Sequence, residues 1–185
     1  MNGFTTDALD FRSASFDEDQ FDRFYEEYFP QVYNLIYFQC KGSVWVEELT
    51  GQVFEKILYN LPRYDHSKGS LSAWICTITR NHLRDHYRSR KHLAAEYGEE
   101  ILLDQADPED GPEERALRKE RQTILVDLLH RLPDRDREIL ILKFYGGLRS
   151  REIAMQLSMN EGAVNMSVSR SMKKLKGMAQ PQLFD

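Results

Sequence analysis

The sequence has few of the features that mark secreted, membrane-bound or disulfide-linked proteins. Cys40 and Cys76 are the only cysteines among 185 residues, too few for a disulfide framework, so we expect a reducing compartment. No stretch approaches the roughly 20 consecutive apolar residues that span a bilayer. The first twenty residues are acidic and lack the basic start and apolar run of a signal peptide. We therefore expect a cytoplasmic protein without direct membrane insertion.

Residue patterns that mark enzymes are also scarce. No glycine-rich loop resembles a phosphate cradle, and no serine or cysteine stands in a recognisable nucleophile motif. His82 and His86 have the i, i+4 spacing of metal ligands and Cys76 lies nearby, but the HExxH pattern is missing and nearby arginines disfavour a divalent cation. We therefore expect no enzyme activity, and no catalytic residue, cofactor, metal or small-molecule substrate.

Charge is distributed in blocks along the chain. The overall net charge of −5 argues against nucleic-acid binding when it is averaged over all residues. Counted by segment, however, residues 21–93 carry +2, residues 94–117 carry −8 and residues 118–185 carry +5. Because exposed charges are screened beyond about 8 Å at physiological salt, the local charge decides whether phosphates bind. The pattern fits nucleic-acid binding by two basic segments, and equally two ordinary domains with a polar linker.

Apolar residues repeat at helical spacing in the first half of the chain and predict a bundle of about four helices. Ser15 and Glu18 have the spacing of a capping box at the start of the first helix. Pro30 suits the first turn of a second helix, where its missing N–H costs nothing. The third helix is expected over 44–60 and the fourth over 71–91. The third helix turns five apolar side chains inward: Leu49, Val53, Phe54, Ile57 and Leu58.

The second half of the chain begins with a predicted linker over 94–114, which is rich in acidic residues, proline and glycine. Pro112 opens the next helix and Pro133 ends it. Asp134 is expected to cap a further helix that reaches Tyr145. No run reads as a strand, so the expected fold class is all-α, with two small helical domains joined by a flexible acidic linker. The expected boundaries are a tail over 1–15, a first domain over 16–93, a linker over 94–114, a second domain over 115–178 and a tail over 179–185.

A helix, tight turn and second helix are predicted between Gly147 and Lys176. The first helix is expected over 150–157 and the second over 161–176. Small Ala154 lets the two helices cross closely, and Asn160 caps the second one. This pattern is typical of the helix-turn-helix, which lays its second helix in the major groove of DNA. Two helices of a plain bundle are the alternative.

The second of these helices has two distinct faces when it is projected at about 100° per residue. Val164, Val168, Met172 and Leu175 cluster on the face that must be core. Asparagine can bond adenine, and arginine or lysine can bond guanine or phosphate. Ser150, Arg151 and Glu161 lie at the starts of the two helices and complete the predicted DNA-binding set. Its other members occupy the second helix opposite the core: Gly162, Asn165, Met166, Ser169, Arg170 and Lys173.

An arginine stripe is predicted on the helix over 71–91. Arg80, Arg84 and Arg88 stand at four-residue intervals, and Trp74 and Asn81 place a ring and an amide among them. A cationic stripe with stackable rings suits duplex phosphates and unpaired bases. The alternatives are a charged solvent face and, for Trp74, an ordinary core position.

In order and spacing, these segments resemble the extracytoplasmic-function (ECF) group of bacterial RNA polymerase sigma factors, within the sigma-70 family. The resemblance covers roughly residues 20–93 and 115–178. Each fragment is weak alone, but their order and spacing together are specific. The matching fragments are Phe21–Tyr28, Pro30–Tyr33, Leu61–Asp65, Gly69–Ile75, Arg80–Asp85, Leu132–Leu140 and the helix-turn-helix.

The resemblance implies a protein that binds core RNA polymerase, directs it to specific promoters and initiates transcription in a stress or envelope response. It also implies an anti-sigma factor as a partner. The helix-turn-helix would read the −35 element, and the acidic linker would run toward the RNA exit channel. Contacts with core polymerase are implied for Glu47, Glu48, Leu49, Gln52 and Val53. Contacts with the −10 element of promoter DNA are implied for Tyr64, His66, Lys68, Trp74, Arg80, Asn81, Arg84 and Arg88.

The chain departs from the family pattern at a few positions, and other functions stay open. Gly51 stands where the family has a polar, helix-favouring residue, at a cost of roughly 1 kcal/mol in a helix interior. Ser158 replaces a frequent turn glycine, and Asn165 and Met166 replace basic residues. A conventional helix-turn-helix regulator would bind an operator tightly without polymerase. A metal nuclease would need paired carboxylates near the arginine stripe, and in a pure interaction module the basic helices would be incidental.

Overall fold

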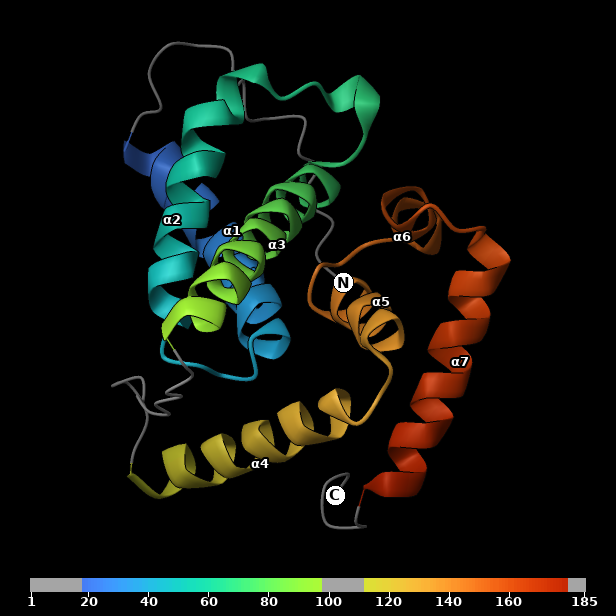
Figure 1. Cartoon of the computed structure of the whole chain (residues 1–185). Coiled ribbons are helices and arrows are strands. Elements are labelled where there is room, and N and C mark those ends of the chain that lie inside the picture. The colour runs from blue at the N-terminus through green and yellow to red at the C-terminus, as the bar shows by residue number, and fades with distance from the viewer. Residues whose placement is uncertain (1–17, 98–111, 180–185) are drawn as a thin grey trace.

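The computed structural model describes residues 18–97 and 112–179, and these residues form helices and connecting turns without a strand (Figure 1). The all-α fold class is therefore confirmed. The tail over 1–15, the capping role of Ser15, the central part of the linker and all but the start of the C-terminal tail lie outside the described residues. The α-helices are α1 Glu18–Gln39, α2 Val46–Asn60, α3 Leu71–Tyr97, α4 Pro112–His130, α5 Asp134–Phe144, α6 Ser150–Leu157 and α7 Glu161–Met178.

The first bundle consists of α1, α2 and α3 packed around one core, with two 3-10 turns, η2 Leu61–Arg63 and η3 His66–Lys68, between α2 and α3. Each helix contributes one apolar face, as the periodicity predicts. The side chains with no exposed surface include Phe24, Val32 and Ile36 from α1, Val53 and Ile57 from α2, and Ile75 from α3.

Helix α1 runs without a break through Pro30, so the prediction of a second helix starting there, and of about four helices in this bundle, is wrong. A proline inside a helix removes one hydrogen bond and crowds the preceding turn, at a cost of about 3 kcal/mol. The helix continues because Phe24, Tyr28, Val32 and Ile36 form a single buried stripe on both sides of the proline. Burial of that stripe outweighs the local preference for a helix start.

Helices α4 to α7 form the second bundle, in which α7 packs against α5 and α6. Ile139, Leu142, Ile153 and Val164 are almost fully buried at its centre. The helix after Pro133 begins at Asp134, which lies inside the first turn and not at the cap position. The capping role predicted for Asp134 is therefore wrong.

The reason lies in the backbone at Pro133 and the use of the Asp134 carboxylate. Pro133 has φ −54° and ψ 143°, so the extended residue that precedes the helix is the proline itself. The Asp134 carboxylate accepts a hydrogen bond from Arg137 Nη2 at 2.8 Å. It supports the first turn through this ion pair and not through a backbone N–H.

The two bundles touch, with α1 beside α5 and the start of α3 facing α6 (Figure 1). Leu35, Phe38 and Cys76 of the first bundle belong to the apolar cluster of the second. The Phe38 ring stacks on the Tyr145 ring with their centroids 4.1 Å apart. The apolar core is therefore continuous from one bundle into the other.

Candidate nucleic-acid interface

The helix-turn-helix consists of α6, a short turn and α7. The Glu152 carboxylate accepts from the backbone N–H of Arg149 at 2.8 Å and holds the start of α6. Ser158 ends α6 in the left-handed conformation, with φ 53° and ψ 48°. The Met159 N–H donates to the Ala154 carbonyl at 2.8 Å and closes the turn. The predicted helix, turn and helix are therefore present, and Ser158 occupies the position that favours glycine.

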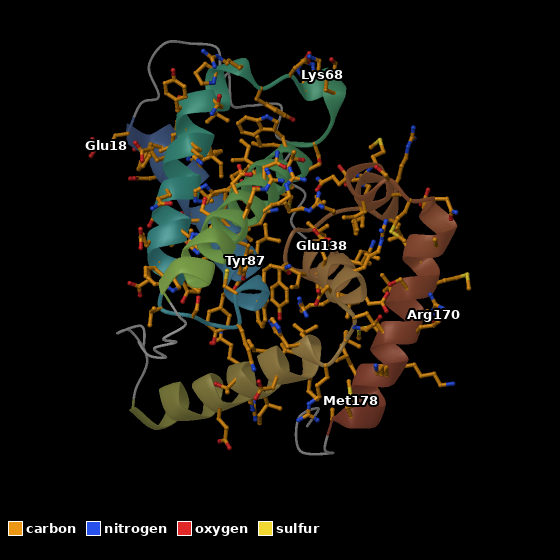
Figure 2. The ribbon with its side chains drawn as sticks, viewed as in Figure 1. Glu18, Lys68, Tyr87, Glu138, Arg170 and Met178 are labelled. Carbon is orange, nitrogen blue, oxygen red and sulfur yellow. The ribbon has the colours of Figure 1, made fainter. Side chains whose placement is uncertain are left out.

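Helix α7 presents the two faces that its sequence predicts. Asn160 Oδ1 accepts from the Ala163 N–H at 2.7 Å, so the predicted cap is confirmed. Val164 and Leu175 are buried, and Val168 and Met172 are half-buried. Figure 2 shows Arg170 on α7 at the outer edge of the molecule. The residues of α7 that belong to the predicted DNA-binding set are all exposed: Glu161, Gly162, Asn165, Met166, Ser169, Arg170 and Lys173.

Ser150, by contrast, is not exposed with the rest of the predicted set, and its DNA contact stays a prediction. The residue is 9% exposed because the first turn of α6 faces the start of α7. Ser150 Oγ donates to Asn165 Oδ1 at 2.6 Å and accepts from Lys143 Nζ at 3.5 Å. Since an amide oxygen has two lone pairs, Asn165 keeps acceptor capacity for a base. Ser150 therefore orients a predicted base-reading residue. Arg151, the next residue of α6, is exposed.

The arginine stripe of α3 is only partly exposed. Asn81, Arg84 and Arg88 lie at the surface, and Arg84 Nη2 donates to Asn81 Oδ1 at 2.7 Å. The Trp74 ring is half-buried against the first core, 5.5 Å from the Tyr64 ring. Three members of the predicted stripe are therefore open to solvent, whereas the Trp74 ring packs in part against the first core.

Arg80 is not exposed with the rest of the stripe. Its Nε donates to Glu138 Oε1 at 2.7 Å, and its Nη1 lies 3.4 Å from both the backbone and side-chain oxygens of Gln156. The Arg80 side chain is 26% exposed. Figure 2 shows Glu138 on the side of α5 that faces α3. The prediction of one continuous free stripe is therefore wrong at Arg80, because its guanidinium is held by the second bundle.

The loop before α3 is held by its own polar groups. Asp65 Oδ1 accepts from the Ser67 N–H at 3.0 Å and from Ser67 Oγ at 2.7 Å, and these bonds hold the pKa of the Asp65 carboxyl below its usual range. The half-buried Tyr64 hydroxyl donates to the Gly69 carbonyl at 2.8 Å, and burial raises its pKa. His66 and Lys68 are exposed, and Figure 2 shows Lys68 at the outer edge of the loop. Tyr64 thus fastens the loop, while the two basic side chains are presented by it.

The predicted polymerase-contact set on α2 divides into two groups. Glu47, Glu48 and Gln52 are exposed, and Gln52 Nε2 donates to Glu48 Oε1 at 2.9 Å. Leu49 is 2% exposed and Val53 is fully buried in the first core. Both side chains therefore face away from the surface on which the acidic residues lie, and the polymerase contact that the resemblance implies for them stays a prediction. They hold the helix that presents the other three.

The sequence patterns did not reveal the residues that join the bundles. Gln31, Glu138, Gly146 and Gln156 make contacts between positions more than fifty residues apart. Gln31, Glu138 and Gln156 fall inside the fragments that carry the family resemblance, but no local pattern shows that they contact the other bundle. Among the described residues, no helix is long and apolar enough to span a membrane, and no group of three or more His, Cys, Asp or Glu is placed to hold a metal ion.

An all-helical chain with a helix-turn-helix and a partly exposed arginine stripe is, in class, a DNA-binding protein. Residues 24–93 match the family described as Sigma-70 region 2, and residues 122–175 match Sigma-70, region 4. The chain is 30% identical over 138 residues to the ECF RNA polymerase sigma factor ShbA of Streptomyces griseus, covering 74% of this chain and 72% of that relative. The chain belongs to the ECF group of RNA polymerase sigma factors.

Other relatives agree with this assignment. The chain is 32% identical over 165 residues to the ECF RNA polymerase sigma factor BldN of Streptomyces coelicolor, covering 89% of this chain but only 62% of BldN. It covers 38% of a probable RNA polymerase sigma factor, RfaY, of Xanthomonas campestris. The chain thus spans less than two thirds of the length of these two relatives.

Two solved structures share the fold at low sequence identity. The sigma factor RpoE, solved with the anti-sigma factor NepR from Bartonella quintana, has a TM-score of 0.65 at 17% identity and covers 86% of this chain and 96% of its own. CnrH, solved with the cytosolic domain of CnrY, has a TM-score of 0.58 at 21% identity and covers 88% of each chain. These likenesses support the two-bundle helical fold.

Proposed function

We propose that this protein is a sigma factor that binds core RNA polymerase in the cytoplasm, directs it to specific promoters and initiates transcription, without enzyme activity of its own. The observation that carries the proposal is the pairing of two exposed sets on separate bundles. One is the stripe of Asn81, Arg84 and Arg88, and the other is the outward face of α7. Two DNA-facing sets in one chain suit a promoter with two separated elements.

The two sets have different chemistry and take different roles. The face of α7 combines Asn165, Ser169, Arg170 and Lys173 with the close approach that Gly162 permits, which suits base edges and phosphates of the duplex −35 element. Arg84, Arg88 and the loop residue Lys68 provide cations, and Asn81 and His66 add polar side chains beside them, which suits the phosphates and unpaired bases of the −10 element. The domains are 16–93 and 115–178, and the acidic segment 94–114 joins them.

The exposed side of α2 is the surface that we assign to core polymerase. Glu47, Glu48 and Gln52 lie there together, supported from below by Leu49 and Val53. Acidic side chains at the start of a helix also stabilise its dipole, so their replacement tests both binding and helix stability. A pulldown with core polymerase must therefore be accompanied by a melting curve for each α2 variant.

We further infer that an anti-sigma factor controls this protein, as part of a stress or envelope response. The inference is supported by the similar structure in which RpoE is bound to the anti-sigma factor NepR. Such a partner would act by covering the surfaces used for polymerase or DNA.

Transcription with purified components tests the proposed function. The protein is mixed with bacterial core polymerase and a genomic promoter library, and start sites are mapped. We expect defined starts only when both proteins are present. If the protein instead binds DNA tightly and specifically alone, and never directs polymerase, it is a conventional operator-binding regulator.

The arginine stripe can be tested within the same assay. Arg84→Ala with Arg88→Ala should reduce promoter opening by at least about tenfold, while polymerase binding is unchanged, because two phosphate contacts of roughly 1 kcal/mol each are lost. Arg23→Ala with Arg131→Ala is the matched control, since both side chains are exposed and lie outside the proposed surfaces. Equal transcription from the two double variants would remove the role assigned to the stripe.

A further inference from the structure

A short chain of polar groups in the second bundle fixes the orientation of the Asn165 side chain. Lys143 Nζ donates to Ser150 Oγ at 3.5 Å, and Ser150 Oγ donates to Asn165 Oδ1 at 2.6 Å. An ammonium group can only donate, and a hydroxyl carries a single hydrogen. The direction of these bonds therefore runs from Lys143 to Asn165. Asn165 accepts the last bond on its oxygen, which leaves Nδ2 as the donor end of the amide.

The same groups lead from the interior of the bundle to the outward face of α7. Lys143 is half-buried in the last turn of α5, and Ser150 is 9% exposed in the first turn of α6. Asn165, in contrast, is exposed on α7. A side chain that is already held in one orientation loses less freedom when a ligand binds. The Asn165 amide is thus preorganised before any DNA arrives.

An amide of fixed orientation distinguishes bases by the order of its donor and acceptor. Adenine presents an N7 acceptor beside an N6 donor in the major groove. Asn165 Nδ2 can donate to N7, and the second lone pair of Asn165 Oδ1 can accept from N6. Guanine presents two acceptors at the same edge, N7 and O6, so its O6 would face the amide oxygen. The observed orientation therefore favours adenine over guanine.

The neighbouring residue on α7 adds apolar surface and no charge. Met166 is 61% exposed on the same outward face, and its thioether has no hydrogen to donate. Apolar side chains suit the methyl group of thymine, the base that pairs with adenine. Arginine or lysine at either position would instead select guanine. Asn165 and Met166 together suit an A·T base pair.

We propose that Ser150 and Lys143 are positioning residues that fix the base specificity of Asn165, and that Asn165 selects an adenine in the −35 element. Both residues act on specificity through the orientation of the Asn165 amide. This proposal rests on the role assigned to α7 under the proposed function, and it adds the base that this part of the helix reads.

Selection from a duplex pool measures the base preference. Fully randomised duplexes are incubated with the full-length protein, with and without core polymerase, and the bound duplexes are sequenced. We expect one position at which adenine exceeds guanine by at least about fivefold, which corresponds to ~1 kcal/mol. Asn165→Lys should change the preferred base at that position to guanine, because lysine donates to guanine N7 and O6. Selection of the same base by both proteins would overturn the proposal.

A modified base tests the contact at the level of one atom. Replacing the selected adenine with 7-deazaadenine removes the N7 acceptor and leaves the N6 amino group in place. The parent protein should bind this duplex about fivefold more weakly. Asn165→Ala, which has no donor to lose, should bind the two duplexes equally. An equal loss in both proteins would show that Asn165 does not contact N7, and would refute the assignment.

The positioning residues are tested by the ratio of the affinities for adenine and guanine duplexes. Ser150→Ala should lower this ratio by about threefold, the effect of one hydrogen bond, because the amide is then free to turn over. Lys143→Met should lower it in the same direction, and Lys143→Arg, which keeps a donor, should restore it. Ser167→Ala is the matched control, since Ser167 is also buried but donates to Asp136 on α5. Equal ratios for Ser150→Ala and Ser167→Ala would refute the positioning role.

The outcomes also separate base selection from the proposed function. If the parent protein directs transcription but Asn165→Lys selects the same base, the sigma-factor role stands and the specificity is refuted. If the selected base changes in duplexes bound by the protein alone while core polymerase is never directed to a start site, base selection stands and the proposed function fails.

Discussion

Gly51 offers a direct test of how α2 is built, because its replacement should stabilise the protein. The residue lies in the interior of α2 and is exposed, and a Cβ there would meet no heavy atom within 4 Å. Glycine in a helix interior is less favourable than alanine by about 1 kcal/mol, largely because the flexible unfolded backbone loses more entropy. Gly51→Ala should therefore raise the free energy of unfolding by about that amount.

The expected gain is large enough to measure by urea unfolding followed by circular dichroism. For a chain of this length, 1 kcal/mol corresponds to a shift of roughly 2–4 °C in the thermal midpoint. Gly146→Ala is the contrasting variant, since its Cβ would lie 2.6 Å from the Leu142 carbonyl and 2.9 Å from Cys76 Sγ. It should lose about 1–3 kcal/mol through overpacking. An unchanged or lower stability for Gly51→Ala would refute the helix geometry described for this position.

Three further outcomes are expected. Ser158→Gly should stabilise the protein by about 0.5–1 kcal/mol in urea unfolding, because Ser158 has a left-handed backbone with φ 53°; a loss would mean that its side chain stabilises the turn. Lys173→Ala should reduce the slope of log affinity against log salt by about 1 for duplex DNA, and an unchanged slope would rule out a phosphate contact. Burial lowers the pKa of His130, although its hydrogen bond to the Phe38 carbonyl raises it. The folded state thus favours the neutral form of His130. Its contribution to the free energy of unfolding should therefore be complete above pH 6.5 and should be lost as the pH falls through the lowered pKa. His130→Gln should weaken that fall in urea melts, whereas an equal pH dependence in both proteins would contradict it.

Local patterns were enough to predict the features that depend on neighbours in the sequence. The cap at Asn160 and the buried stripe that includes Val164 and Leu175 follow from residues within one helix. Periodicity also places Leu49 and Val53 inward, and the structure confirms that placement. Periodicity predicts such positions well because burial is what sets an apolar repeat.

Features that depend on distant parts of the chain could not be predicted in this way. Pro30 signals a helix start locally, but burial of α1 as a whole overrides that signal. Arg80 has the same spacing as Arg84 and Arg88. It differs from them because it forms an ion pair with Glu138 of the other bundle. The sequence places Ser150 among the predicted DNA contacts, and only the position of α7 shows that its hydroxyl bonds Asn165.

The extension of the core from α1 into the second bundle has a thermodynamic consequence for every ligand that needs the bundles apart. Separating them exposes Phe38 and Tyr145, which now stack on each other, and re-hydrating one large apolar side chain costs about 1.5–3 kcal/mol. Any partner that does not cover these rings must spend part of its binding free energy on exposing them. Such a partner should therefore bind a fragment lacking the second bundle more tightly than the whole chain, even at a surface that both share.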